Sequence, residues 1–217
     1  MLEPWAGRKP RLRGVLHQWA FLSFVPLGVG LVVAAGSTRA RIAVTVYALS
    51  VVALFGTSAL YHRVDWRSLT ARLWMRRLDH SMIFVLIAGT YTPFALVALH
   101  GPLALVILVT VWAGALAGIG FNLVWTGSPT WLRAMLYVAL GWVAVAALPQ
   151  LAAAIGVWGL TLVALGGVLY TLGAIVYSAK RPDPRPSVFG YHEVFHALVI
   201  VAAALQYAVI ALWIAPG

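Results

Sequence analysis

The chain has 217 residues, of which 63% are hydrophobic and 9% are charged, and its mean hydropathy is +0.94. This composition is too apolar for a water-soluble domain and places the chain in a lipid bilayer. The formal net charge of +10 comes from basic residues in short segments between apolar runs, which indicates membrane topology and argues against nucleic-acid binding. Cysteine is absent, which excludes disulfide bonds and thiolate ligands, so a metal site has to use histidine and carboxylate.

The apolar runs predict an all-α, polytopic membrane protein. A helix needs about 20 apolar residues to cross about 30 Å of hydrocarbon, and the runs are too long and too free of alternation for a β-barrel. We expect one domain over residues 1–217, a multi-pass bundle of seven transmembrane helices in the cell (plasma or inner) membrane. The expected spans are approximately 15–35, 42–62, 79–99, 103–124, 132–150, 156–178 and 190–214. The breaks between them include the basic stretch 63–77 and the segment around Pro149–Gly156.

Arginine and lysine are unequally divided between the two sides that seven spans define. The side that holds the amino terminus carries thirteen of these residues, and the other side carries only Arg39 and Arg41. Short loops rich in Lys and Arg stay on the cytoplasmic side of a membrane. The sequence therefore predicts a cytoplasmic amino terminus and a carboxyl terminus outside.

Ionisable residues at helix ends form the candidate site. His192 and His196 are four residues apart, which places two imidazoles on one helix face, as a shared divalent metal requires. The expected second span ends at His62, and the third begins on the same side at Asp79. Ser58 lies one turn before His62 on the same face. Because these helix ends lie on the same side of the membrane, we expect these side chains to converge. Three protein ligands with an open position are typical of a catalytic zinc.

Each of these residues also has a simpler interpretation. The histidines could hydrogen-bond between helices, and Asp79 could cap the third span or pair with Arg76 or Arg77. Asp79 could also ligate a metal directly and close the site. The sequence HEVFH at 192–196 fits H-E-x-x-H, which would make Glu193 the general base of an intramembrane metalloprotease with Asp79 as third ligand. His17, His80 and His100 are not expected to be ligands.

Five segments, taken in order, resemble the hemolysin III family, the bacterial branch of the progestin and adipoQ receptors, which is related to the alkaline ceramidases. They are SALYHRVDW (58–66), RRLDHSMIFVLIAGTYTPF (76–94), LYVALGW (136–142), GGVLYTLGAIVYS (166–178) and GYHEVFHALVI (190–200). The resemblance implies a seven-helix fold with Zn²⁺ held by three histidines near the cytoplasmic face. Its S-x-x-x-H, D and H-x-x-x-H motifs fall here on Ser58, His62, Asp79, His192 and His196.

The leading hypothesis is a zinc-dependent hydrolase that acts on a lipid amide or ester near the cytoplasmic leaflet. Metal held by His62, His192 and His196 would activate water, and Asp79 with Ser58 would orient that water or take its proton. Membrane lipids are the expected partners and source of substrate. A receptor or regulator with a structural zinc is the main alternative. Cytolytic activity is a further alternative, which comes only from the family name.

Overall fold

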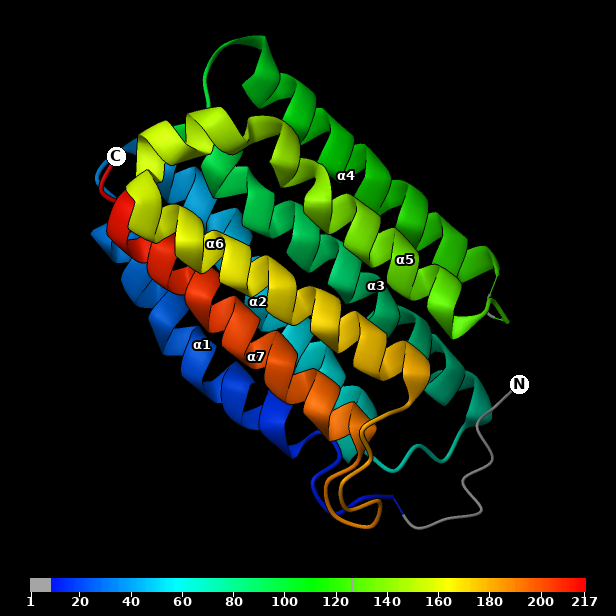
Figure 1. Cartoon of the computed structure of the whole chain (residues 1–217). Helices are drawn as coiled ribbons and strands as arrows, with labels where there is room; N and C mark the ends of the chain where they lie inside the picture. Colours follow the sequence, from blue (N-terminus) through cyan, green and yellow to red (C-terminus); the bar gives the residue numbers. More distant parts are fainter. Residues whose placement is uncertain (1–8, 126) are drawn as a thin grey trace.

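The computed structural model describes residues 9–125 and 127–217, which form a helical bundle (Figure 1). Arg8, one of the thirteen basic residues expected on the side of the amino terminus, lies outside the described residues. Short π or 3₁₀ segments continue three of the helices: η1 (Phe94–Ala98), η2 (Trp142–Ala147) and η3 (Ile210–Ile214). The α-helices are α1 (Val15–Ala34), α2 (Thr38–Arg63), α3 (Leu69–Pro93), α4 (Gly101–Val124), α5 (Thr130–Gly141), α6 (Leu148–Ala179) and α7 (Tyr191–Val209).

Six helical stretches within the described ranges are long and apolar enough to cross a membrane, which confirms a multi-pass, all-helical fold. The fifth of these stretches, Thr130–Ala179, is 50 residues long and contains α5, η2 and α6. A straight helix of that length would measure about 75 Å, far more than a bilayer core. Gly156 interrupts it with φ 63° and ψ −177°, a conformation that glycine adopts readily. In Figure 1 the stretch turns back, and α5 and α6 pack side by side.

The expected break at 63–77 and the expected start of the third span at Asp79 are wrong. Helix α3 begins at Leu69, and the Ser68 side chain caps it by accepting a hydrogen bond from the backbone N–H of Ala71 at 3.3 Å. The segment 69–88 contains no glycine or proline, so nothing stops the helix there despite its basic residues. Asp79 therefore lies three turns inside α3, which excludes the capping role considered for it.

The order of packing places the last helix, α7, beside the first, α1. Each of α1, α2 and α3 packs on the next, and α7 packs on both α6 and α1. Glycines permit some of the closest approaches: a Cβ on Gly89 would stand 2.2 Å from Ser50 Oγ, and one on Gly118 would stand 2.3 Å from Phe84 Cζ. As a result, residues near positions 13, 62 and 192 share one end of the bundle.

We name the two ends of the bundle for what they carry. The histidine end is where α2 finishes at Arg63 and α7 begins at Tyr191. There the backbone N–H groups of Arg11 and Leu12 donate to the carbonyls of Ser187 and Val188, both at 3.1 Å, so the amino-terminal segment covers the loop before α7. At the opposite end, Gly36 N–H donates to the Ala215 carbonyl at 2.8 Å.

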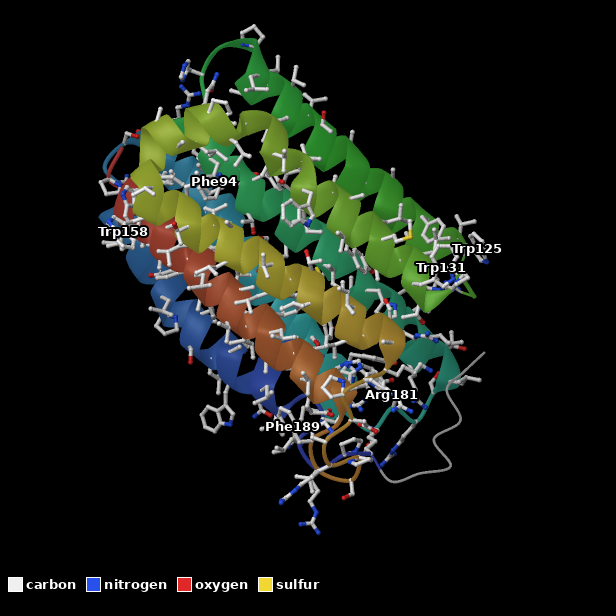
Figure 2. The ribbon with its side chains drawn as sticks, in the orientation of Figure 1. Phe94, Trp125, Trp131, Trp158, Arg181 and Phe189 are labelled. Carbon is white, nitrogen blue, oxygen red and sulfur yellow. The ribbon has the colours of Figure 1, made fainter. Side chains whose placement is uncertain are left out.

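Exposed tryptophans lie near both ends of the bundle. Figure 2 shows Trp125 and Trp131 beside the loop between α4 and α5, and Trp158 near the opposite end. Between 51% and 76% of each of these residues is exposed. Amphipathic rings of this kind favour the headgroup level of a bilayer, so the long axis of the bundle is the direction in which the chain crosses the membrane.

Candidate metal centre

Three helices supply the side chains of the centre. His62 is the penultimate residue of α2, Asp79 lies in α3, and His192 and His196 occupy the first turns of α7. The i, i+4 spacing on α7 places both imidazoles on one face, where both rings approach that of His62 on α2. The structure thus brings together the histidines that the sequence analysis expected to converge.

The three imidazoles are close enough to share one ion. One ring nitrogen from each histidine forms a set whose members all lie within 4.8 Å of one another. The Nε2 atoms of His62 and His192 are 3.2 Å apart, close to the separation of about 3.3 Å that two ligands of a tetrahedral zinc have when each bond is about 2.0 Å. The limit of 4.8 Å for the whole set is wider than that value, so the three nitrogens are near one another without matching the spacing of a bound ion.

The donor set also fits a metal chemically. His62 and His196 are buried, and Nδ1 of His196 has no hydrogen-bond partner in the described part of the chain. A buried imidazole without a partner is costly, and neutral imidazole nitrogens are common ligands of zinc and other first-row ions. Three neighbouring histidines therefore suit a divalent first-row ion.

Asp79 stands beside the histidines. Its Oδ2 is 3.9 Å from Nε2 of His62, too far for a hydrogen bond, and the Ser58 side chain interacts with the Asp79 carboxylate. Ser58 and Asp79 are both buried. Asp79 is thus held by a residue one helical turn from His62, at a position from which it can meet a small molecule placed between it and the imidazoles.

The centre borders the polar end of a cavity of about 410 Å³, whose lining does not include His62. Ser58, Asp79, His192 and His196 line it, and most of its remaining lining is apolar, from Ile83 and Leu86 to Leu151, Val163 and Val199. The cavity extends along the bundle to Phe94, which Figure 2 places near the end away from Arg181 and Phe189. Its volume falls within the range of small-molecule sites, and its shape separates a polar end from an apolar body.

Glu193 is not free to act as a base. Its Oε1 accepts from Nε of the buried Arg13, and its Oε2 accepts from the backbone N–H of Gly190 at 2.8 Å. The second contact belongs to the start of α7, where a glutamate in the first turn bonds back to the residue before the helix. Glu193 is fully buried and is not among the residues that line the cavity. The geometry therefore argues against the metalloprotease interpretation of HEVFH.

Sequence reasoning missed two histidines that border the centre. The ring of His17, on α1, stacks on that of His196 with centroids 3.6 Å apart and planes 9° from parallel. His80 lines the cavity, and its Nε2 is 3.3 Å from the Tyr177 hydroxyl. Both are ionisable residues inside apolar helices, which is itself a signal of function. The spacing of metal ligands does not include them.

Gly14 explains how α1 approaches the centre. Its φ of +79° is in the left-handed region, and a Cβ there would stand 2.6 Å from Cβ of His62. Only glycine combines that backbone conformation with so close a contact. Gly14 therefore allows the start of α1, and with it His17, to pack against the end of α2.

The fold and the site together define an integral, multi-pass membrane protein with a cluster of three buried or half-buried histidines at one end of a helical bundle. The family model described as "Haemolysin-III related" matches residues 6–207, and the chain belongs to this family. This result confirms the resemblance seen in the sequence motifs.

Individual relatives agree with this assignment. The chain is 33% identical to the Hemolysin-3 homolog of Bacillus subtilis over 196 residues, which cover 89% of this chain and 88% of that protein. It is 30% identical to Hemolysin-3 of Bacillus cereus over 181 residues, or 83% of this chain and 79% of the relative. A weaker similarity, 24% over 170 residues, links it to the human Monocyte to macrophage differentiation factor, covering 77% of this chain and 68% of that protein.

Proposed function

We propose that the chain is a zinc-dependent hydrolase that cleaves an amide or ester bond of a membrane lipid. The observation that carries the proposal is one cavity of about 410 Å³ that joins His192, His196 and Asp79 to a long apolar body. A hydrolase for lipids needs both parts: a polar end where water and the scissile carbonyl meet, and an apolar body that holds the hydrocarbon chain. A water-soluble substrate has no hydrocarbon chain that would occupy the apolar body.

We further propose that the chain crosses the membrane seven times. In this arrangement α5 with η2 crosses once, and the part of α6 after Gly156, about 35 Å long, crosses back. Seven crossings leave thirteen of the fifteen Lys and Arg residues at the side of the histidine end, with Arg39 and Arg41 at the other. The positive-inside rule then assigns the histidine end to the cytoplasm, and the site lies near the cytoplasmic leaflet.

The chain's own residues account for binding and proton transfer. His62, His192 and His196 would hold the zinc, which when bound supplies Lewis acidity that polarises the carbonyl and makes water nucleophilic near neutral pH. Asp79 takes a proton from the attacking water at Oδ2, the oxygen that faces His62. The Ser58 hydroxyl keeps the carboxylate in that orientation. Asp79 then returns the proton to the leaving nitrogen or oxygen, which yields a fatty acid and an amine or alcohol.

The apolar body of the cavity positions the substrate. Leu86, Leu151 and Val199 line it along the bundle, and an acyl chain laid against them excludes water from the polar end except at the scissile bond. Holding the carbonyl beside Asp79 converts a reaction between separate molecules into one within a complex, which is worth several orders of magnitude in rate.

The proposal is tested with the purified protein and two lipid substrates, an N-acyl amide and an acyl ester. The Asp79→Asn variant is expected to keep its zinc and to lose turnover by about 10²- to 10⁴-fold, the usual contribution of a general base. Asp65→Asn is the matched control, because the Asp65 side chain is 95% exposed and its carboxylate pairs with Lys9 away from the cavity. Zinc-loaded wild type that turns over neither lipid, or an unimpaired Asp79→Asn variant, would refute the proposed reaction.

A second candidate function is a receptor or regulator in which zinc has a structural role. The observation that favours it is that the three histidines come from α2 and α7, helices that each pack on α1. An ion bound between them would tie these two helices together at the histidine end. Metal-dependent stability without turnover of either lipid would support this candidate. Lysis of erythrocytes by the purified chain tests the activity that the name Hemolysin-3 of the Bacillus cereus relative suggests.

A further inference from the structure

His17 is a buried histidine of α1 that contacts the metal centre through the face of its ring. It is 3% exposed, and its ring stacks on that of His196 with centroids 3.6 Å apart and planes 9° from parallel. The set of three ligand nitrogens that lie within 4.8 Å of one another contains none from His17. In this arrangement His17 is therefore a neighbour of the expected ligands and is not one of them.

His196 lacks the protein contact that usually orients a histidine ligand. A metal-bound imidazole commonly donates its second ring N–H to a carboxylate or a backbone carbonyl, which fixes the plane of the ring. The Nε2 atoms of His62 and His192 face each other, and if His196 also binds through Nε2, its Nδ1 is the nitrogen that such a bond would hold. That Nδ1 is buried and has no hydrogen-bond partner in the described part of the chain. Among the protein groups around His196, its ring contacts are therefore left to orient it.

These ring contacts connect three helices. The ring of Phe55, on α2, lies 5.0 Å from that of His17 at an interplanar angle of 64°. His17, on α1, in turn stacks on His196, on α7. Gly14 allows α1 to approach so closely, because its φ is +79° and a Cβ there would stand 2.6 Å from Cβ of His62. His17 is thus held by α2 and presents a fixed surface to the ring of His196.

The geometry of the stack favours a metal-bound His196. Two neutral aromatic rings prefer an offset or edge-to-face arrangement, with centroids about 4.5–7 Å apart, to closer parallel contact. A positively charged group over the face of a ring is attracted by the negative charge of that face. An ion bound to His196 withdraws electrons from its imidazole, so the ring over His17 becomes more positive. The stack then gains strength when the ion binds, and by reciprocity the ion binds more tightly when the stack is present.

We propose that His17 is a positioning residue that strengthens metal binding by stacking on His196, without ligating the ion. This inference rests on the proposed zinc site and adds to it a residue from α1, a helix that supplies none of the expected ligands. The role requires an aromatic ring at position 17 and does not require ring nitrogens. A ligand would require a nitrogen, and a residue that only fills space would require neither, so substitutions separate the three roles.

The test is the metal affinity of the purified protein, measured for Zn²⁺ by competition with a chelator and for Co²⁺ by its visible absorption bands, which report coordination geometry. His17→Leu removes the ring and should weaken Zn²⁺ binding about tenfold, the effect of one cation–π contact in a buried site. It should also shift the Co²⁺ bands, because His196 loses its orientation. His17→Phe keeps a ring that can stack, and should bind Zn²⁺ within about threefold of wild type with unchanged Co²⁺ bands.

Phe24→Leu is the matched control. Phe24 is buried about two turns further along the same face of α1, and its ring contacts those of Phe55 and Tyr207. This variant removes an aromatic ring from the same helix and should leave the Zn²⁺ affinity and the Co²⁺ bands as in wild type. If His17→Leu does not fold, His17→Met replaces it, because an unbranched apolar side chain adapts to an irregular site.

Three results would overturn the proposal. Wild-type affinity and Co²⁺ bands in the variant without a ring would show that the stack contributes nothing to metal binding. A loss in His17→Phe equal to that in His17→Leu would show that the ring nitrogens are required. An equal loss in Phe24→Leu would show that packing of α1 in general supports the site. Because the assay contains no lipid, the predicted affinities without cleavage of either lipid would refute only the hydrolase.

Discussion

The two ends of the bundle are built in different ways. At the histidine end, imidazoles from α2 and α7 lie within 4.8 Å of one another beside an acidic residue of α3. At the opposite end, backbone and cap interactions close the fold: Gly36 N–H donates to Ala215, and the Ser37 hydroxyl donates to the Gly217 carbonyl at 2.8 Å. The first end contains a cluster of buried ionisable groups that could bind a ligand. At the second end, these polar groups form hydrogen bonds with one another. Function is therefore expected at the first end and stability alone at the second.

The largest effect on stability is expected from the buried ion pair at the histidine end. Glu193→Gln removes the carboxylate charge from the buried ion pair with Arg13, which should lower the free energy of unfolding by about 3–5 kcal/mol. Unfolding of the purified protein in detergent, followed by circular dichroism, measures the change. The double variant Arg13→Met with Glu193→Gln removes both charges and should recover most of the loss. A double variant as unstable as the single one would show that charge pairing is not the cause.

The next largest effect is expected from removal of the metal, which should depend on the histidine end. If zinc is present at about one hundred times its dissociation constant, its binding stabilises the folded state by about 2.7 kcal/mol, and a chelator should remove that amount. The thermal unfolding midpoint of wild type should then fall on chelation, whereas that of His62→Ala should not move. His100→Ala, which removes an exposed histidine before α4, serves as the control and should respond like wild type. A wild-type unfolding midpoint that does not change on chelation would show that no bound ion stabilises the protein.

A smaller effect is expected where α1 meets α2. Gly14→Ala places a side chain at a left-handed φ of +79° and against His62, and should cost about 1–2 kcal/mol for the backbone alone. It should also reduce metal content, because His62 is displaced. Gly30→Ala, in the helix that begins after Gly14 and with open space at its Cβ, should be neutral or stabilising. Equal effects at the two positions would contradict the role given to Gly14.

The smallest effect belongs to the opposite end. Ser37 caps α2 by accepting a hydrogen bond from Ala40 N–H at 3.1 Å, so Ser37→Ala should lower the free energy of unfolding by about 1 kcal/mol. Ser37→Thr keeps a hydroxyl that can accept from Ala40 and donate to Gly217, and should lose less. Metal content should be the same in all three proteins. A loss of metal on changing Ser37 would mean that the ends are coupled and that the contrast between them is wrong.

Hydropathy and local spacing were sufficient to predict much of this structure. The helix α7 was expected over 190–214 and is observed from Tyr191, continuing through η3 to Ile214. The convergence of His62 with the pair on α7 followed from the direction in which successive helices run. These features depend on short-range periodicity and on the length of a membrane span, both of which a single sequence displays.

The start of α3 could not be found by hydropathy alone. The basic character of residues 69–77 predicts a loop, but they contain good helix formers and follow a serine cap. In this turn the Arg77 guanidinium lies 4.5 Å from the centre of the Trp74 ring, a contact that helical geometry creates. A polar helical turn is not marked by high hydropathy. Its charge therefore makes the predicted start of α3 too late in the sequence.

Contacts between residues far apart in the sequence were also beyond prediction. The Arg13–Glu193 pair joins positions 180 residues apart, and the stacking of His17 on His196 depends on how α1 packs against α7. The turn at Gly156 depends on a positive φ that the residue permits but does not require. Such features follow from tertiary packing, for which one sequence gives no pairing information.

The most direct test of the account is the metal content of the purified protein. Elemental analysis should find about one zinc ion per chain in wild type and in His100→Ala, and almost none in the His192→Ala/His196→Ala double variant. That result would establish the histidine cluster as the site of the ion. Equal metal content in all three proteins would contradict the central claim, because the ion would then be bound elsewhere or not specifically at all.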